Sequence, residues 1–139
     1  MNEIQNTSGK LTLTVTTGAR TELVDITADV NRLLASAKET SGRLCHVYAP
    51  HTTAGITINE NADPTVSRDI VKVLNTIIPW EADYQHLEGN SAAHIKSSLV
   101  GASQTIAIEN NRLVLGRWQG LFFCEFDGPR TRTVQIRLF

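Results

Sequence analysis

The stretch from His51 to Asp63 constrains the fold more than any other part of the sequence, because it combines a short apolar segment with polar residues at both ends. Ile56 and Ile58 alternate with polar residues, and this period of two is typical of a half-buried β-strand. Asp63 then precedes a proline, a common start of an α-helix with an acidic N-cap. The stretch therefore predicts a strand that leads into a helix, with His51 and Glu60 at opposite ends of the strand.

Apolar periodicity divides the rest of the chain into further strands and helices. Alternating patterns predict strands at residues 10–17, 21–26, 43–48, 105–109, 113–115, 120–126 and 131–139. Helical patterns predict helices at residues 27–39, with Thr27 as the cap and Gly42 as the stop, at residues 64–78, and in a short segment that begins at Ser91.

The order of these elements predicts how they pack. Residues 10–17 and 21–26 follow each other closely, as in a hairpin, and the strands after residue 105 are predicted to form an antiparallel meander with a turn at Asn110 and Asn111. The helix at residues 64–78 is expected to cover one sheet face. Strands before and after the helices indicate an α+β fold, with a largely antiparallel or mixed β-sheet, two main amphipathic helices and a short third helix.

Length and composition predict a single domain over residues 1–139. With 139 residues, of which 41% are hydrophobic, the chain is long enough for one substantial core and too short for two. A formal net charge of −1 gives no general attraction to nucleic acid or to an anionic membrane. The sequence has neither a signal-peptide pattern nor an apolar run of ~20 residues, so we expect a cytoplasmic protein. Cys45 and Cys124 are interpreted as buried free thiols.

Several blocks of sequence together resemble one known family. They are His51-Thr52-Thr53-Ala54-Gly55, Asn59-Glu60-Asn61-Ala62-Asp63-Pro64, His86-Leu87-Glu88-Gly89-Asn90, Ala93-His94-Ile95-Lys96 and Gly116-Arg117-Trp118-Gln119-Gly120. Over essentially its whole length the chain resembles the YjbQ-like family, which is described as secondary thiamine-phosphate synthase. The resemblance implies a compact α+β subunit that assembles as a homotrimer, with the histidine-bearing segments in a cleft near the subunit boundary. Many relatives carry an acidic residue where this chain has Ala92, so a role of that acid does not transfer.

The activity implied by the resemblance joins an aminopyrimidine methyl diphosphate to a thiazole phosphate and releases pyrophosphate. Such a step needs neutralisation of the leaving oxygens, by a divalent ion or by Arg, Lys and helix N-termini. We therefore expect an enzyme whose partner is a phosphorylated small molecule, with no nucleic acid and no membrane involved. Two alternatives stay open, namely a metal-dependent hydrolase of a phosphate or amide, and a non-catalytic trimer that binds a metabolite or metal.

Three histidines inside these blocks are predicted to converge on one divalent ion and to serve catalysis. His51 ends a connection between strands, His86 lies in a long polar loop, and His94 begins the short helix. Three neutral imidazoles leave an open position for water or a phosphate oxygen, as in catalytic zinc sites. Glu60 could then orient a ligand or act as a general base. Zinc suits the nitrogen-rich set, whereas magnesium held through Glu60 and Asp63 is the alternative.

Further residues are predicted to bind the substrate and its phosphate groups. They are Thr52, Thr53, Asn90, Lys96, Trp118, Gln119, Arg130 and Arg132. Arg130 and Arg132 are two positions apart and are predicted to face one side of a strand, where Lys96 could complete an anion clamp; a charged strand edge is the alternative. Trp118 and Gln119 could contact a heteroaromatic ring or merely anchor a turn.

Two acidic residues near the end of the chain receive no assigned role. Glu125 and Asp127 are two positions apart, which places both carboxylates on the same face if the strand continues. The sequence Asp127-Gly128-Pro129 also suits a turn, so Asp127 is at least equally compatible with a turn.

Overall fold

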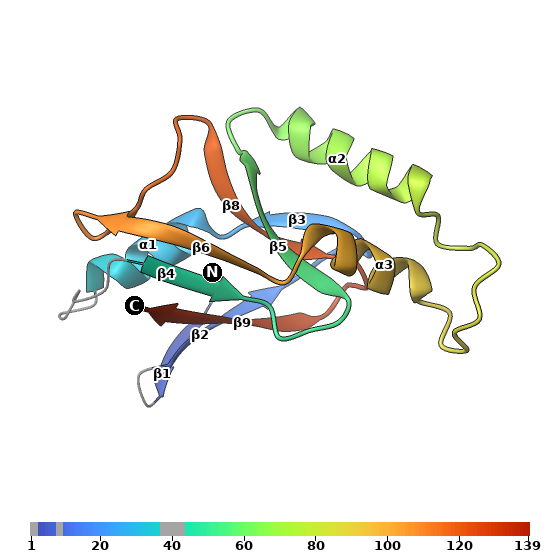
Figure 1. Ribbon diagram of the computed structural model, residues 1–139, viewed down its shortest axis with the longest axis horizontal. Coiled ribbons are helices and arrows are strands. Elements are labelled where there is room, and N and C mark those ends of the chain that lie inside the picture. Colours follow the sequence, from blue (N-terminus) through green and yellow to red (C-terminus); the bar gives the residue numbers. More distant parts are fainter. Residues whose placement is uncertain (1–2, 8–9, 37–43) are drawn as a thin grey trace.

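A computed structural model describes residues 3–7, 10–36 and 44–139 of the chain (Figure 1). Its larger sheet contains, in spatial order, β1 (Glu3–Thr7), β2 (Lys10–Thr16), β9 (Thr131–Leu138), β4 (Leu44–Tyr48), β6 (Ser103–Glu109) and β7 (Arg112–Leu113). Its smaller sheet contains β3 (Glu22–Asp25), β8 (Gln119–Glu125) and β5 (Ala54–Glu60). The helices of the described ranges are α1 (Thr27–Ser36), α2 (Pro64–Ile77) and α3 (Ser91–Val100). The predicted α+β class is confirmed.

The main core lies between the two sheets and α1. Side chains alternate along a strand, so one face of each sheet can be apolar throughout. Ile56 of β5 and Phe123 of β8 meet Val47 of β4 and Val134 of β9, and all four side chains are fully buried in one cluster. Val30 of α1 belongs to the same cluster. This packing fixes the smaller sheet against the larger one and so aligns the ends of β5, β8 and β9.

A second layer of helices lies on the other face of the smaller sheet. Ala93 of α3 packs with Cys124 and Phe126 in a small separate cluster. By contrast, α2 contains no fully buried residue, and Figure 1 shows it at the outer side of the smaller sheet. The predicted helix does contact the smaller sheet, as expected, but it covers the sheet face only loosely, through half-buried residues such as Leu74.

Among the described helices, α2 begins with the predicted side-chain cap, whereas α1 begins at Thr27 itself, so the prediction of Thr27 as its cap is wrong. Asp63 caps α2 by accepting a hydrogen bond from the Thr65 N–H at 2.9 Å, with Pro64 at the first helical position, as predicted. Asn90, rather than Ser91, occupies the N-cap position of α3. The predicted end of the first helix at residue 39 and its stop at residue 42 lie outside the described residues.

No described helix is long and apolar enough to cross a membrane.

Strand pairing departs from the sequence-based expectation at both ends of the chain. β2 pairs with β9 whereas β3 pairs with β8, so these consecutive strands belong to different sheets and the predicted hairpin is wrong. β6 and β7 do form a hairpin, with the predicted turn at Asn110 and Asn111, whose φ angles are 51° and 59°. β8 and β9 then return to different sheets, so the meander is also wrong. Apolar alternation identifies the face that is buried, but it does not identify the neighbouring strand.

Both cysteines are buried free thiols, as predicted. Burial raises the pKa of the Cys45 thiol to about 12, and it does the same for Cys124. Because the thiolate is the reactive form, neither residue is a candidate nucleophile near neutral pH.

Gly55 of β5 is required by a close approach of α3, and its replacement tests that packing. A Cβ atom at Gly55 would lie 2.7 Å from the Gly101 carbonyl oxygen, which also accepts the Ile56 N–H at 3.0 Å. We expect Gly55→Ala to lower the free energy of unfolding by about 1–3 kcal/mol, measured by urea denaturation. Gly18→Ala is the matched control, because its Cβ would meet only the Glu22 side chain at 3.8 Å. Equal losses in the two variants would contradict this account.

Candidate functional site

A pocket of about 660 Å³ lies where loops from both sheets meet the start of α3. Its walls include many of the predicted site residues, namely His51, Thr52, Thr53, His86, Asn90, His94, Arg130 and Arg132. Three further polar residues in the walls, Tyr48, Glu88 and Asp127, were not assigned to the site from the sequence. The volume is in the range of small-molecule sites.

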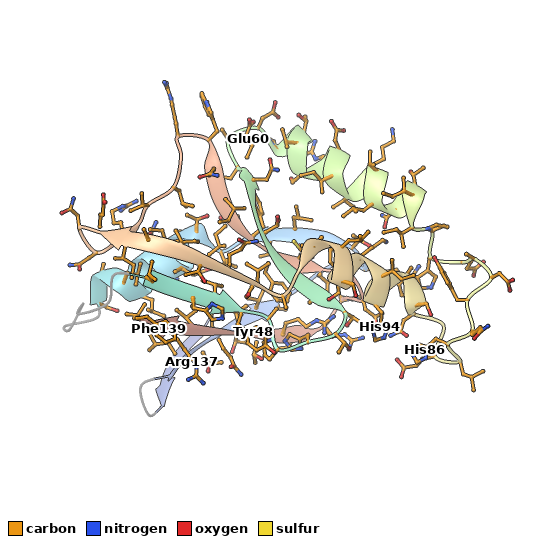
Figure 2. All side chains as sticks on the ribbon, in the orientation of Figure 1. Tyr48, Glu60, His86, His94, Arg137 and Phe139 are labelled. Carbon is orange, nitrogen blue, oxygen red and sulfur yellow. The ribbon has the colours of Figure 1, made fainter. Side chains whose placement is uncertain are left out.

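His86 and His94 are neighbours at one side of this pocket. Their ring centroids are 5.4 Å apart, with the rings perpendicular, and Figure 2 shows both at the same end of the molecule. His51 contributes to the same pocket from the loop before β5. Among the described residues, no three His, Cys, Asp or Glu side chains are grouped closely enough to hold one metal ion. The three-histidine metal centre is thus not preformed in this part of the chain and stays a prediction.

His51 bonds the backbone of β9 at a position where β9 has no partner strand on the β4 side. The pairing of β4 with β9 ends at Tyr48 opposite Gln135, so Thr133 lies beyond it. His51 Nε2 lies 2.9 Å from the Thr133 carbonyl oxygen and 3.2 Å from the Thr133 nitrogen. Burial lowers the pKa of His51, so the neutral ring is favoured. The shorter contact suits a proton on Nε2, which leaves the lone pair of Nδ1 free to accept.

A buried ion pair closes the base of the pocket. Arg132 Nε lies 2.9 Å from Glu125 Oε1, and its Nη2 donates to Thr53 Oγ1 at 2.9 Å. Both charged side chains are almost completely buried. Burial raises the pKa of Glu125, but hydrogen bonds from Arg132, the Asp127 N–H and Thr17 outweigh this effect and hold it below its usual value. Arg132 is therefore mainly committed to Glu125 and Thr53.

The predicted anion clamp of Arg130, Arg132 and Lys96 is not formed. Arg130 precedes β9 and lies at the pocket rim, where it pairs with Asp127 at 3.1 Å and is 49% exposed, while Arg132 points into the protein. Lys96 is buried and its Nζ donates to Asn75 Oδ1 of α2 at 2.5 Å. Burial also lowers the pKa of Lys96. Both arginines line the same pocket, as their two-residue spacing predicted, but Arg132 is occupied by Glu125 and Thr53 and Lys96 is not among the residues of the pocket walls.

Glu60, Trp118 and Gln119 lie at the opposite end of the β5–β8 pair. Glu60 pairs with Gln119, and β5 has 7 residues, so roughly 20 Å of strand separates Glu60 from the histidine end. Figure 2 shows Glu60 well away from His86 and His94. Trp118 is half-exposed and lies under the Arg117 guanidinium. The predicted pairing of Glu60 with a histidine-bound ion is thus wrong within one chain. Trp118 and Gln119, which were predicted to contact a heteroaromatic ring of the substrate, do not line this pocket either.

Asn90 links the two acidic residues that sequence reasoning did not place in the site. Its Nδ2 donates to Glu88 Oε2 at 3.0 Å and to Asp127 Oδ2 at 2.9 Å. Glu88 lies in the same sequence block as His86 and Asn90, which was the available signal. Asp127 gave a weaker signal, because its Gly-Pro neighbours also suit a turn.

Fold and site together define an α+β protein with a histidine-lined pocket, and comparison with known proteins identifies its family. The chain matches the family described as UPF0047 protein YjbQ-like over residues 11–139. It is 55% identical over 128 residues to UPF0047 protein YugU of Bacillus subtilis, covering 91% of this chain and 96% of that protein. It is 53% identical over 124 residues to a UPF0047 protein of Methanocaldococcus jannaschii, covering 89% of each.

Solved structures agree with this relationship. The crystal structure of an uncharacterised YjbQ/UPF0047-family protein from Clostridium acetobutylicum has a TM-score of 0.87 at 48% identity, covering 92% of this chain and 98% of that one. A conserved hypothetical protein from Thermus thermophilus has a TM-score of 0.85 at 43% identity, with the same coverage. The chain belongs to the YjbQ-like UPF0047 family, which confirms the family resemblance and the fold.

The buried pair predicts unequal effects of the two arginines on stability. Arg132→Leu leaves the Glu125 carboxylate buried without its main partner, so we expect a loss of about 3–5 kcal/mol in urea denaturation. Arg130→Ala removes an exposed pair and should cost about 1 kcal/mol or less. A double variant with Glu125→Leu should recover much of the loss, since an apolar pair can replace a buried ionic one. Similar losses for Arg132→Leu and Arg130→Ala would contradict the assignment.

The environment of His51 predicts an unusual titration. Because burial lowers the pKa of His51, its NMR titration midpoint should lie below about 6.5, the ordinary value for histidine. The same residue in urea-unfolded protein serves as the control and should return to about 6.5. A folded-state midpoint at or above the unfolded one would show that burial does not outweigh the contact with Thr133, which raises the pKa of His51.

Proposed function

We propose that the chain is an enzyme that acts on a phosphorylated small molecule in this pocket. We further propose that its reaction joins an aminopyrimidine methyl diphosphate to a thiazole phosphate, as in secondary thiamine-phosphate synthase. The observation that carries the proposal is the meeting of three distant blocks, around His51, His94 and Arg130, in one pocket of small-molecule size. Convergence of this kind is expected of a binding site and is not required by the core.

The pocket offers groups suited to departure of a diphosphate. In the proposed step the C–O bond to the diphosphate breaks, pyrophosphate leaves with the bonding electrons, and the thiazole nitrogen forms the new C–N bond. Arg130 at the rim can stabilise the developing negative charge. His86 or His94 can donate a hydrogen bond or a proton to the leaving oxygen. Since Trp118 lies elsewhere, aromatic contact with the substrate would come from Tyr48, which lines the pocket.

A divalent ion, zinc or alternatively magnesium, stays a prediction. His86 and His94 are adjacent and His51 lines the same pocket, so these are the residues that would hold such an ion. The homotrimer and the cytoplasmic location also stay predictions that come from the resemblance and the sequence.

The proposal is tested by incubating the full chain with the two phosphorylated substrates and measuring thiamine phosphate and pyrophosphate. We expect both products to form, and His94→Ala to lower kcat/KM by about 100-fold or more, the usual contribution of an acid–base residue. His46→Ala is the control for loss of a histidine outside the pocket, because His46 bonds Thr105; its ring also stacks with Tyr48, so a small change is expected there but no 100-fold loss. Parallel samples with chelator, together with metal analysis of wild type and both histidine variants, show whether an ion takes part.

Each alternative gives a different result in the same assay. Hydrolysis of a substrate without condensation would favour a metal-dependent hydrolase, particularly if chelator stopped it. Tight binding without turnover would favour a non-catalytic metabolite-binding protein. Equal activity of His94→Ala and His46→Ala would remove this pocket from the chemistry.

A further inference from the structure

Asn90 has a buried acceptor atom without a partner. The residue is only 6% exposed and lines the pocket. Within the described part of the chain, its Oδ1 is the single buried side-chain nitrogen or oxygen that lacks a hydrogen bond. Buried polar atoms are almost always paired in proteins, so such an atom in a pocket wall indicates a missing donor.

The orientation of the Asn90 amide is fixed by its neighbours. Nδ2 donates to Glu88 and to Asp127, and carboxylates accept but do not donate hydrogen bonds when ionised. Rotating the amide would place Oδ1 against both carboxylates and leave Nδ2 unpaired. Although Asn90 stands at the N-cap position of α3, its side chain makes no capping bond. The free acceptor is therefore used by neither the acidic pair nor the helix.

The group that would complete this arrangement must donate more than one hydrogen bond. Oδ1 and the two carboxylates all accept, and they belong to one pocket wall. Arg130 neutralises part of the Asp127 charge, whereas Glu88 accepts a hydrogen bond from the neutral Asn90 amide. An amino group has two or three N–H donors and suits this wall, a hydroxyl has one, and a carbonyl has none.

We propose that Asn90, Glu88 and Asp127 form the subsite that binds an amino group of the ligand, attached to a planar ring in the substrate of the proposed reaction. This inference rests on the proposed function for the phosphorylated ligand. It goes further because it assigns ligand discrimination to Asn90, with Glu88 as the second acceptor.

Binding of a matched pair of probes tests the subsite without requiring turnover. The probes are an aminopyrimidine methyl phosphate and the same molecule with hydrogen in place of the amino group, compared by isothermal titration calorimetry. The wild-type chain should bind the amino probe about tenfold more tightly, since a buried acceptor gains a partner. In Asn90→Ala this preference should disappear. A purely structural role of Asn90 would instead weaken both probes equally.

Two more variants keep the test clear if Asn90→Ala disturbs the loop. Glu88→Gln changes an exposed side chain and should reduce the preference for the amino probe while the deaminated probe binds as before. Asn59→Ala is the matched control, because Asn59 lies at the far end of β5 and should keep the full preference.

The outcomes separate this inference from the proposed function. Equal affinity of wild type for the two probes, or no binding of either, overturns the subsite. Binding of Mg²⁺ or Zn²⁺ that Asn90→Ala abolishes, with no preference between the probes, overturns it in favour of a cation. If wild type prefers the amino probe but makes no thiamine phosphate, the subsite stands and the proposed reaction is rejected. If it makes thiamine phosphate but binds both probes equally, the reaction stands and the subsite is rejected.

Discussion

The buried ion pair between Glu125 and Arg132 is the interaction on which the pocket depends. It joins β8 of the smaller sheet to β9 of the larger sheet at the end where the apolar core stops. Thr53 and Thr17 also bond this pair, so the chain before β5 and after β2 is attached to the same two side chains. A buried charge is costly unless it is fully partnered, which makes this arrangement nearly all-or-none. The loops that shape the pocket are thereby fixed relative to the core.

This dependence connects the fold to the candidate chemistry. The Asp127 N–H bonds Glu125, and the Asp127 side chain in turn holds Asn90 and Arg130. Asp127, Asn90 and Arg130 are thus positioned through a series of hydrogen bonds that begins at Glu125 in the core. Altering Arg132 would change activity through position, even though its guanidinium is mainly occupied by internal partners. A loss of activity in such a variant is therefore informative only beside a measurement of stability.

Local features of the sequence predicted most elements and part of the pocket. The alternation in β5, the Asp63 cap and the Asn110–Asn111 turn are set by neighbouring residues, and each was predicted. Strand partners depend on distant residues, so the expected hairpin and meander failed. The assignment of Glu60 to the histidine site failed for a different reason, because the strand predicted between His51 and Glu60 already placed these two residues at opposite ends. The commitment of Arg132 to Glu125 was not visible either, because it depends on two sheets packing together.

Two groups beside the pocket make the folded chain resist protonation. Hydrogen bonds outweigh burial and lower the pKa of Glu125 in the folded chain. Its contribution to stability is therefore fully present at pH above the pKa of the unfolded chain, and it is lost as the pH falls through the pKa of the folded chain. Burial lowers the pKa of His51, so the unfolded chain takes up that proton first as pH falls below about 6.5. Both effects have the same sign. The geometry of the pocket therefore rests on a neutral imidazole and an ionised carboxylate, and acid should weaken the fold from the pocket end of the inter-sheet core.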